Sequence, residues 1–160
     1  MTNPWDFDEL CRMGAQMLHN EPTGVDFEAL LWAIGGVESS HGTFYGPRHE
    51  KAYCRGGRYY DRKLTRKHNC MAHCSYGPWQ IMYANAVAIK KPITPELMLD
   101  PLHALPITVG WMRRVVGRGA ITVRDIADAW NSGSHRDSIV PVAYIRKVEK
   151  LYRERIDVEF

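Results

Sequence analysis

The sequence lacks any apolar run that approaches the ~20 residues of a membrane-spanning helix. Its first eight residues also lack the basic start and apolar stretch of a secretory signal peptide. Internal repeats and low-complexity tracts are absent, which excludes a repeat array. We therefore expect a chain that has no transmembrane span and is not exported by the general secretory route.

Strong charge of either sign is missing as well. The formal net charge is only +3, which favours an anionic partner but is too small to indicate nucleic acid by itself. The composition, with 45% hydrophobic and 24% charged residues, is that of a globular protein, and 160 residues suffice for one domain with a real core. We expect a single domain over residues 1–160 that acts as a monomer.

Alternating strand patterns are scarce, whereas helical spacing of apolar residues recurs along the chain. The segments with this spacing are 6–19, 27–39, 81–89, 101–117, 122–133 and 141–155. Asp26, Asp100 and Thr122 stand where side chains cap the first turn of a helix. The sequence therefore predicts an all-α, or at least α-dominated, domain.

The helical spacing fails between Gly42 and Ser75, which we call the basic segment. It contains eight Lys or Arg residues against two acidic residues, with four tyrosines between them. Loops longer than about 15 residues inside a compact domain are usually functional or disordered. We interpret the basic segment as an elaborated lobe or β-hairpin beside a groove, and we expect any strands to lie around Tyr53 and Tyr59.

Cysteines are few, and Cys54, Cys70 and Cys74 all lie in the basic segment. Together with His68, and with His73 as an alternate ligand, they are candidate ligands of a tetrahedral structural zinc site. Such a site would stabilise a loop of low apolar content. The irregular spacing leaves two other states open, a disulfide from Cys54 to Cys70 or Cys74, and free thiols. No other cofactor is expected.

One acidic residue stands out in the predicted helix 27–39. At helical spacing, Glu38 continues the apolar stripe of Leu31 and Ile34, so it should face the core. A carboxyl group in apolar surroundings tends to have a raised pKa and to stay protonated near neutral pH, as a general acid must. The alternative is a glutamate that points into water from a frayed helix end. The pair Gly35-Gly36 predicts that another helix or a ligand passes close to the same helix.

Four short motifs occur in a fixed order along the chain. They are Glu38-Ser39 at a helix end, Ser-Tyr-Gly-Pro-Trp-Gln-Ile-Met at 75–82, Ala-Trp-Asn-Ser-Gly at 129–133, and Tyr-Ile-Arg-Lys-Val at 144–148 in the last helix. This order resembles the soluble lytic transglycosylase domain, whose motifs are Glu-Ser, Gly-Leu-Met-Gln, Ala-Tyr-Asn-Ala-Gly and a tyrosine-containing C-terminal helix. The resemblance covers about residues 25–155 and implies a lysozyme-like fold, which goose-type lysozymes share.

The resemblance implies cleavage of the β-1,4 bond between N-acetylmuramic acid and N-acetylglucosamine in peptidoglycan, with a 1,6-anhydromuramic product. Glu38 would protonate the glycosidic oxygen and then, as a carboxylate, accept a proton from the 6-hydroxyl of muramic acid. The alternative on the same fold is a lysozyme-type hydrolase, which needs an activated water or a second carboxylate. Asp61, Asp125 and Asp128 are the sequence candidates for that second group, although Asp125 and Asp128 also suit helix capping.

Further side chains are expected to contact the sugar, each with a structural alternative as a cap or as core. Gln80 and Asn131 are amides suited to N-acetyl and hydroxyl groups. Four aromatic residues offer faces for sugar rings, and at least one is expected to be buried packing only: Tyr45, Tyr76, Trp79 and Trp130. Ser39 and Tyr144 would lie near the scissile bond. Trp79 and Trp130 depart from the family pattern, which has methionine and tyrosine there.

Two interpretations belong to other classes of protein. The basic segment suits a nucleic-acid-binding module whose tyrosines stack on bases, and a catalytically silent wall-binding or virion-assembly protein would share the same fold. For the enzyme, the expected partner is the glycan strand of peptidoglycan in the bacterial cell wall, reached in the periplasm or from outside. Without a signal peptide, delivery would depend on phage lysis, which we favour, on a virion, or on a specialised secretion system.

Overall fold

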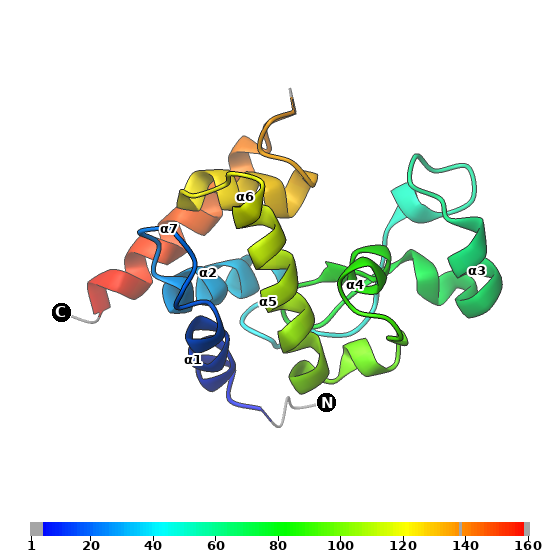
Figure 1. Ribbon diagram of the computed structural model, residues 1–160, viewed down its shortest axis with the longest axis horizontal. Helices are drawn as coiled ribbons and strands as arrows, with labels where there is room; N and C mark the ends of the chain where they lie inside the picture. Colours follow the sequence, from blue (N-terminus) through cyan, green and yellow to red (C-terminus); the bar gives the residue numbers. More distant parts are fainter. Residues whose placement is uncertain (1–4, 138, 159–160) are drawn as a thin grey trace.

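The computed structural model describes residues 5–137 and 139–158, and these residues form a helix-dominated fold. The described part of the chain contains seven α-helices: α1 (Phe7–Met17), α2 (Phe27–Ser39), α3 (Arg62–His68), α4 (Tyr83–Ile89), α5 (Pro101–Gly117), α6 (Val123–Ser132) and α7 (Val142–Val158). In Figure 1, α5 runs through the middle, with α1, α2 and α7 to one side and α3 at the opposite end. The predicted α-dominated class is confirmed. Among the described residues, no helix is both long and apolar enough to cross a membrane.

Side-chain caps determine where three of the helices begin. Asp26, Asp100 and Thr122 each accept a hydrogen bond from a backbone N–H of the first turn, at 2.9–3.1 Å. Each cap satisfies a donor that has no partner inside its helix. All six predicted helices are present, and α4 begins two residues later than expected because the residues before it form a strand.

A three-stranded antiparallel sheet in the order β1-β2-β3 lies beside the helices: β1 (Arg48–His49), β2 (Cys74–Tyr76) and β3 (Ile81–Met82). The expectation of strands around Tyr53 and Tyr59 is wrong. Tyr53 ends the 3₁₀ helix η1 (Lys51–Tyr53), and Tyr59 follows in a turn. The backbone bonds locally there, because the turn at Gly56, with φ of 84°, leaves no extended run to pair.

The helix α3 was missed because it buries no apolar face. None of its seven residues is buried, so the sequence shows no core-facing period there. Its start is set by Asp61, whose Oδ1 accepts the N–H groups of Lys63 and Leu64 at 2.8 and 3.0 Å. A second 3₁₀ helix, η2 (Asn69–His73), follows and leads into β2, and a third, η3 (Leu97–Leu99), precedes α5.

The glycine pair of α2 lies where two helices approach closely. A Cβ on Gly35 would lie 2.2 Å from Cζ of Phe7 on α1. A Cβ on Gly36 would lie 2.9 Å from Cδ1 of Leu151 on α7. The predicted close approach of another helix is therefore confirmed, on both sides of α2. This packing places the end of α2, which carries Glu38, against α7.

Candidate active site

Glu38 lies in the last turn of α2 with its side chain only 10% exposed. Its Oε1 accepts a hydrogen bond from the hydroxyl of Tyr144 on α7 at 2.7 Å. Its Oε2 accepts one from Nη2 of Arg48 on β1 at 3.3 Å. Glu38 therefore faces the interior, as predicted, and is not at a frayed end in water. Three elements converge on one carboxyl group, and one of them, α7, brings a residue 106 positions further along the chain.

These surroundings act on the pKa of Glu38 in opposite directions. Burial raises the pKa because it disfavours the charged carboxylate, while the Tyr144 hydroxyl and the Arg48 guanidinium lower it by stabilising that charge. Burial is the larger effect, so the pKa of Glu38 lies above its ordinary value of 4.5. Burial also raises the pKa of Tyr144 well above its ordinary value, so the hydroxyl stays a donor at neutral pH.

Arg48 and Glu50 extend this arrangement along the sheet. Nε of Arg48 donates to Oε1 of Glu50 at 2.8 Å, and Oγ of Ser75 lies 3.1 Å from the same oxygen. None of these three residues was predicted as a site residue on its own. Arg48 counted only as one of eight basic residues. It reaches Glu38 because β1 pairs with β2, with Arg48 opposite Ser75.

A groove passes over Glu38. On one side, a hollow of about 590 Å³ is lined by the loop from Thr43 to Arg48, with Gln80 and Leu99. On the other, a hollow of about 700 Å³ is lined by residues of the sheet, α5, and the end of α6. Both hollows are bordered by Glu38, Arg48 and Gln80. A chain-like ligand bound along the groove would therefore place a middle linkage at the carboxyl group.

Five of the predicted site residues lie in or next to this groove. Tyr45 lines the first hollow, Trp130 and the exposed Asn131 line the second, and Gln80 borders both. The fifth, Tyr144, contacts Glu38 directly. The amide of Gln80 is already used by the protein, because its Nε2 donates to the carbonyls of Gly77 at 2.9 Å and of the groove-lining Gly46 at 3.3 Å. Gln80 therefore holds the wall in place.

Three predicted contacts do not face the groove. Tyr76 and Trp79 are each 0% exposed, and their polar atoms donate to the carbonyls of Met71 at 2.6 Å and Leu31 at 2.9 Å. Both side chains are core packing, as expected for at least one of the four aromatic residues. Ser39 is 2% exposed, and its Oγ donates to a carbonyl one turn earlier in α2 at 3.0 Å. Its role is the structural one.

The carboxylates suggested for a hydrolase also lie elsewhere. Asp61 caps α3, and Asp128 is 6% exposed with its Oδ1 accepting the Ser132 hydroxyl at 3.0 Å. Neither of them, nor Asp125 in the first turn of α6, lines either hollow. Besides Glu38, the described acids that line the groove are Glu50 and Asp137.

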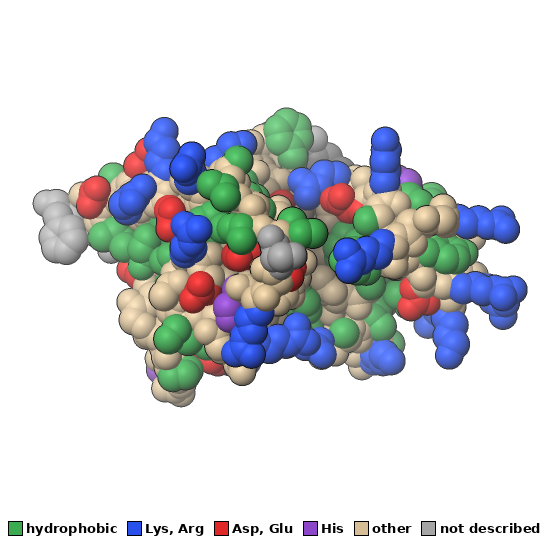
Figure 2. All heavy atoms as spheres, turned by 90° about the horizontal axis from the view of Figure 1, so that it is seen from above, with side chains coloured by type: hydrophobic (Ala, Val, Ile, Leu, Met, Phe, Trp, Pro, Cys, Tyr) green, Lys and Arg blue, Asp and Glu red, His purple; other side chains and the backbone are tan. Residues whose placement is uncertain are grey.

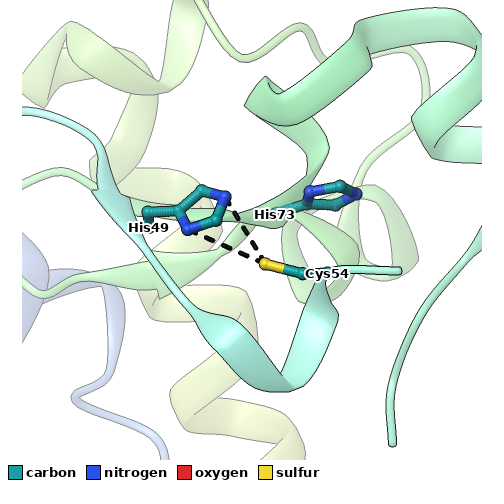
Figure 3. Close-up of side chains that lie close together, drawn as sticks. All are labelled: His49, Cys54 and His73. Carbon is teal, nitrogen blue, oxygen red and sulfur yellow. Dashed lines mark hydrogen bonds between the residues drawn. The ribbon is translucent and has the colours of Figure 1, made fainter. Parts of the chain in front are cut away.

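The predicted zinc ligands are not brought together as a set. His68 contacts the Tyr83 hydroxyl at 3.0 Å through Nε2, and Cys70 is exposed. All four cysteines are free thiols, so the disulfide that was left open is not formed. Cys54 instead lies beside His49 and the alternate ligand His73 (Figure 3). His49 was not predicted, although it lies only five residues before Cys54; its proximity to His73 comes from strand pairing, which sets His49 opposite Cys74.

No protein-family model, curated protein or solved structure matches this chain. Its function must therefore be inferred from the side chains around Glu38 and from the order of the motifs.

Proposed function

We propose that this protein is a peptidoglycan lytic transglycosylase, a lyase that cleaves the β-1,4 bond between N-acetylmuramic acid and N-acetylglucosamine and forms 1,6-anhydromuramic acid. The observation that carries this proposal is a buried carboxyl group of raised pKa, Glu38, in the middle of a groove. A raised pKa keeps the proton on a general acid near neutral pH.

Glu38 acts twice in the proposed reaction. Its carboxyl proton passes to the glycosidic oxygen as the bond from that oxygen to C1 of muramic acid breaks. The 6-hydroxyl oxygen of the same muramic acid then attacks C1, and its proton returns to the Glu38 carboxylate. Cleavage gives two fragments. One begins with a free 4-hydroxyl group on N-acetylglucosamine, and the other ends in 1,6-anhydromuramic acid. No water is consumed, and Glu38 ends in its starting protonation state.

Tyr144 and Arg48 support the step at which Glu38 is charged. Both donate hydrogen bonds to its two oxygens, so they stabilise the carboxylate left after the first proton transfer. They also hold the carboxyl group in one orientation, which brings the proton and the glycosidic oxygen into reach. Tyr45 lines one hollow and offers an aromatic face to a sugar ring beside the cleaved bond. Trp130 lines the other hollow but is only 9% exposed, so it shapes that wall of the groove.

The lysozyme-type hydrolase is the second candidate, and Glu50 is the acid that would favour it. Glu50 lines the groove, but its Oε1 is already within hydrogen-bond distance of Arg48 and Ser75. That oxygen is therefore occupied, which leaves only Oε2 of Glu50 to activate water. This favours attack by the sugar's own 6-hydroxyl.

Mass spectrometry of the soluble products from purified peptidoglycan tests the proposal. We expect anhydromuropeptides from the native protein and a loss of about 10²–10⁴-fold in rate for Glu38→Gln. Glu154→Gln is the matched control, because this exposed glutamate lies on α7 outside the groove. Reducing-end products one water heavier would establish a muramidase instead and direct attention to Glu50. If no product appeared from the native protein, the proposal would give way to a binding role.

A further inference from the structure

A second cluster of polar side chains lies behind the groove wall. His49 is on β1, Cys54 follows η1, and His73 ends η2. The potential ligand atoms of these three residues all lie within 4.8 Å of one another. Figure 3 shows the sulfur of Cys54 directed toward the His49 ring, with the His73 ring beside them. None of them lines either hollow of the groove, so the cluster needs its own explanation.

We propose that His49, Cys54 and His73 bind a Zn²⁺ ion. In a tetrahedral zinc site with Zn–N of about 2.1 Å and Zn–S of about 2.3 Å, the nitrogen and sulfur ligands lie about 3.6 Å apart. Sγ of Cys54 lies 3.4 Å from Nε2 and 3.7 Å from Nδ1 of His49. Either distance has the size that a shared zinc ion requires, but only one nitrogen can be the ligand, so the His49 ring must turn to aim that nitrogen at the ion.

The hydrogen bonds of His73 leave one ring nitrogen free for a metal. The hydroxyl of Thr65 donates its only proton to the carbonyl of Asp61 at 2.7 Å. It can therefore only accept from Nε2 of His73, which lies 2.9 Å away. Nε2 thus carries the ring proton and Nδ1 has the lone pair. Zinc-binding histidines commonly have this support, in which the second ring nitrogen donates to a neighbouring oxygen.

The donor set and its surroundings select the class of metal. Two imidazoles and a thiolate suit zinc, whereas calcium and magnesium prefer oxygen ligands. The basic segment presents eight exposed Lys or Arg side chains and no ring of carboxylates that would attract a hard cation: Arg48, Lys51, Arg55, Arg58, Arg62, Lys63, Arg66 and Lys67. Since His49 is exposed, an ion can reach the cluster from solvent.

The ion would supply what the apolar contacts of this region do not. No residue of η1 or α3 is buried. Zinc bound at both ends of the stretch from Cys54 to His73 would close it onto β1, and the binding free energy would add to the stability of the folded segment. Arg48, which contacts Glu38, directly precedes His49 on β1. The zinc proposal does not depend on the proposed reaction, so each can be tested without the other.

Zinc content of the full-length protein is the first test. After incubation with zinc and desalting, we expect one zinc ion per chain by elemental mass spectrometry. Cys54→Ser and His73→Gln should each lose most of it. Cys70→Ser is the matched control, because this exposed thiol is outside the cluster and should leave zinc content unchanged. Less than about a tenth of an equivalent in the native protein, or equal loss in Cys70→Ser, overturns the assignment.

Two further measurements protect the test against variants that fail to fold. Cobalt substituted into the native protein should show thiolate-to-cobalt charge-transfer absorption; its absence overturns Cys54 as a ligand. Chelation with EDTA should lower Tm of the native protein by about 5–10 °C, with recovery on adding zinc.

Thr65→Val keeps the shape of the side chain but removes the support of His73, and should weaken zinc binding about 10–100-fold. No change in zinc affinity would contradict the tautomer argued above.

Discussion

The Glu38 carboxyl group is governed by three contributions that do not act in the same direction. Burial under α7 and the sheet raises its pKa, and the donors Tyr144 and Arg48 partly counter that rise. A mechanism that uses Glu38 first as an acid and then as a base needs both, because the group must hold its proton at the start and tolerate charge midway. At this scale, the chemistry depends on two hydrogen bonds.

Replacing Tyr144 by Phe should shift the pH profile of activity to higher pH. The lost hydrogen bond had stabilised the carboxylate, so the pKa of Glu38 rises further and the acid form persists into more alkaline solution. We also expect kcat to fall about 10–100-fold, because the carboxyl group is less well positioned. Release of soluble glycan fragments across a pH series measures both effects.

Tyr152→Phe is the control for this experiment. Tyr152 lies on the same helix, but its hydroxyl accepts the N–H of Asp26 at 3.0 Å, outside the groove. The alkaline limb should not move in that variant. A limb that moves to lower pH in Tyr144→Phe would contradict the assigned hydrogen bond.

Glu38→Gln should raise stability at neutral pH while lowering activity by about 10²–10⁴-fold. The folded pKa of Glu38 is raised, so its favourable contribution is complete below the ordinary value of 4.5 and is lost as pH rises through the folded pKa. Glutamine cannot ionise, so we expect Tm to exceed that of the native protein by about 2–4 °C at pH 7. The difference should vanish toward pH 4. Thermal melts of both proteins at pH 7 and pH 4 measure this difference. A lower Tm for Glu38→Gln at pH 7 would show that the ion pair of Glu38 with Arg48 stabilises the native protein by more than burial of the charge destabilises it.

Among the elements, α2 is the one on which the site is built. Its core residues Leu30, Leu31 and Ile34 are fully buried, and its glycine pair lets α1 and α7 come close. Close approach of α7 is what carries Tyr144 to Glu38. The sheet brings Arg48 from the other direction. The site therefore depends on the spacing between helices as well as on the identity of its polar residues.

Gly35→Ala should destabilise the protein even though alanine favours helices. The added methyl group would lie 2.2 Å from Cζ of Phe7. The Phe7 ring is held between Trp79 and His41, with ring centroids 5.5 and 5.9 Å away, so it cannot easily move. Overpacking lowers the free energy of unfolding by about 1–3 kcal/mol, and the higher helix propensity of alanine offsets about 1 kcal/mol of that loss. Urea denaturation should show a net loss.

A glycine with open space around it provides the comparison. Gly117 ends α5, and a Cβ there would meet nothing within 4 Å. Gly117→Ala should therefore be neutral or stabilising in the same assay. Equal stabilisation by both substitutions would contradict a close α1–α2 contact at Gly35.

Over the whole molecule, charge is unevenly distributed although the net charge is small. Figure 2 shows Lys and Arg side chains gathered at the end where Figure 1 places α3. This end belongs to the basic segment and lies beside the groove rather than in it. Such a surface attracts anionic polymers over a range set by the ionic strength.

Replacing Arg62, Lys63 and Arg66 together by glutamine should weaken binding to anionic cell walls. The contacts are electrostatic, so binding by the parent protein should also fall between about 50 and 200 mM salt. Co-sedimentation with purified walls, using the Glu38→Gln background to prevent cleavage, measures both effects. Binding that ignores both the substitutions and the salt would rule out an electrostatic role for this end of the molecule.

The matched control replaces Lys147, Lys150 and Arg153, three exposed cations on α7, by glutamine. It changes the net charge equally but leaves the basic segment intact, so wall binding should persist. Single-stranded DNA is the competing ligand in the same assay. Tighter binding to DNA than to walls would favour the nucleic-acid-binding interpretation.

The sequence by itself determined the helices, their caps and the inward direction of Glu38. Asp26, Asp100 and Thr122 act within one helical turn, and the stripe that leads to Glu38 is a spacing within one helix. Interactions of this range are readable without the fold. The short helix α3 was not predicted, because none of its residues is buried and the sequence shows no apolar period there. The capping residue Asp61 was the only local signal of this helix.

Only the tertiary structure decided which side chains meet. Tyr144 and Glu38 are 106 residues apart, and their contact exists because α7 packs on α2. Strand pairing carries Arg48 to the carboxyl group and His49 to the cluster with Cys54 and His73. Packing also turned Tyr76 and Trp79 into core residues, although their motif suggested sugar contacts. Burial and long-range contact depend on what the rest of the chain places nearby, and no local spacing encodes that.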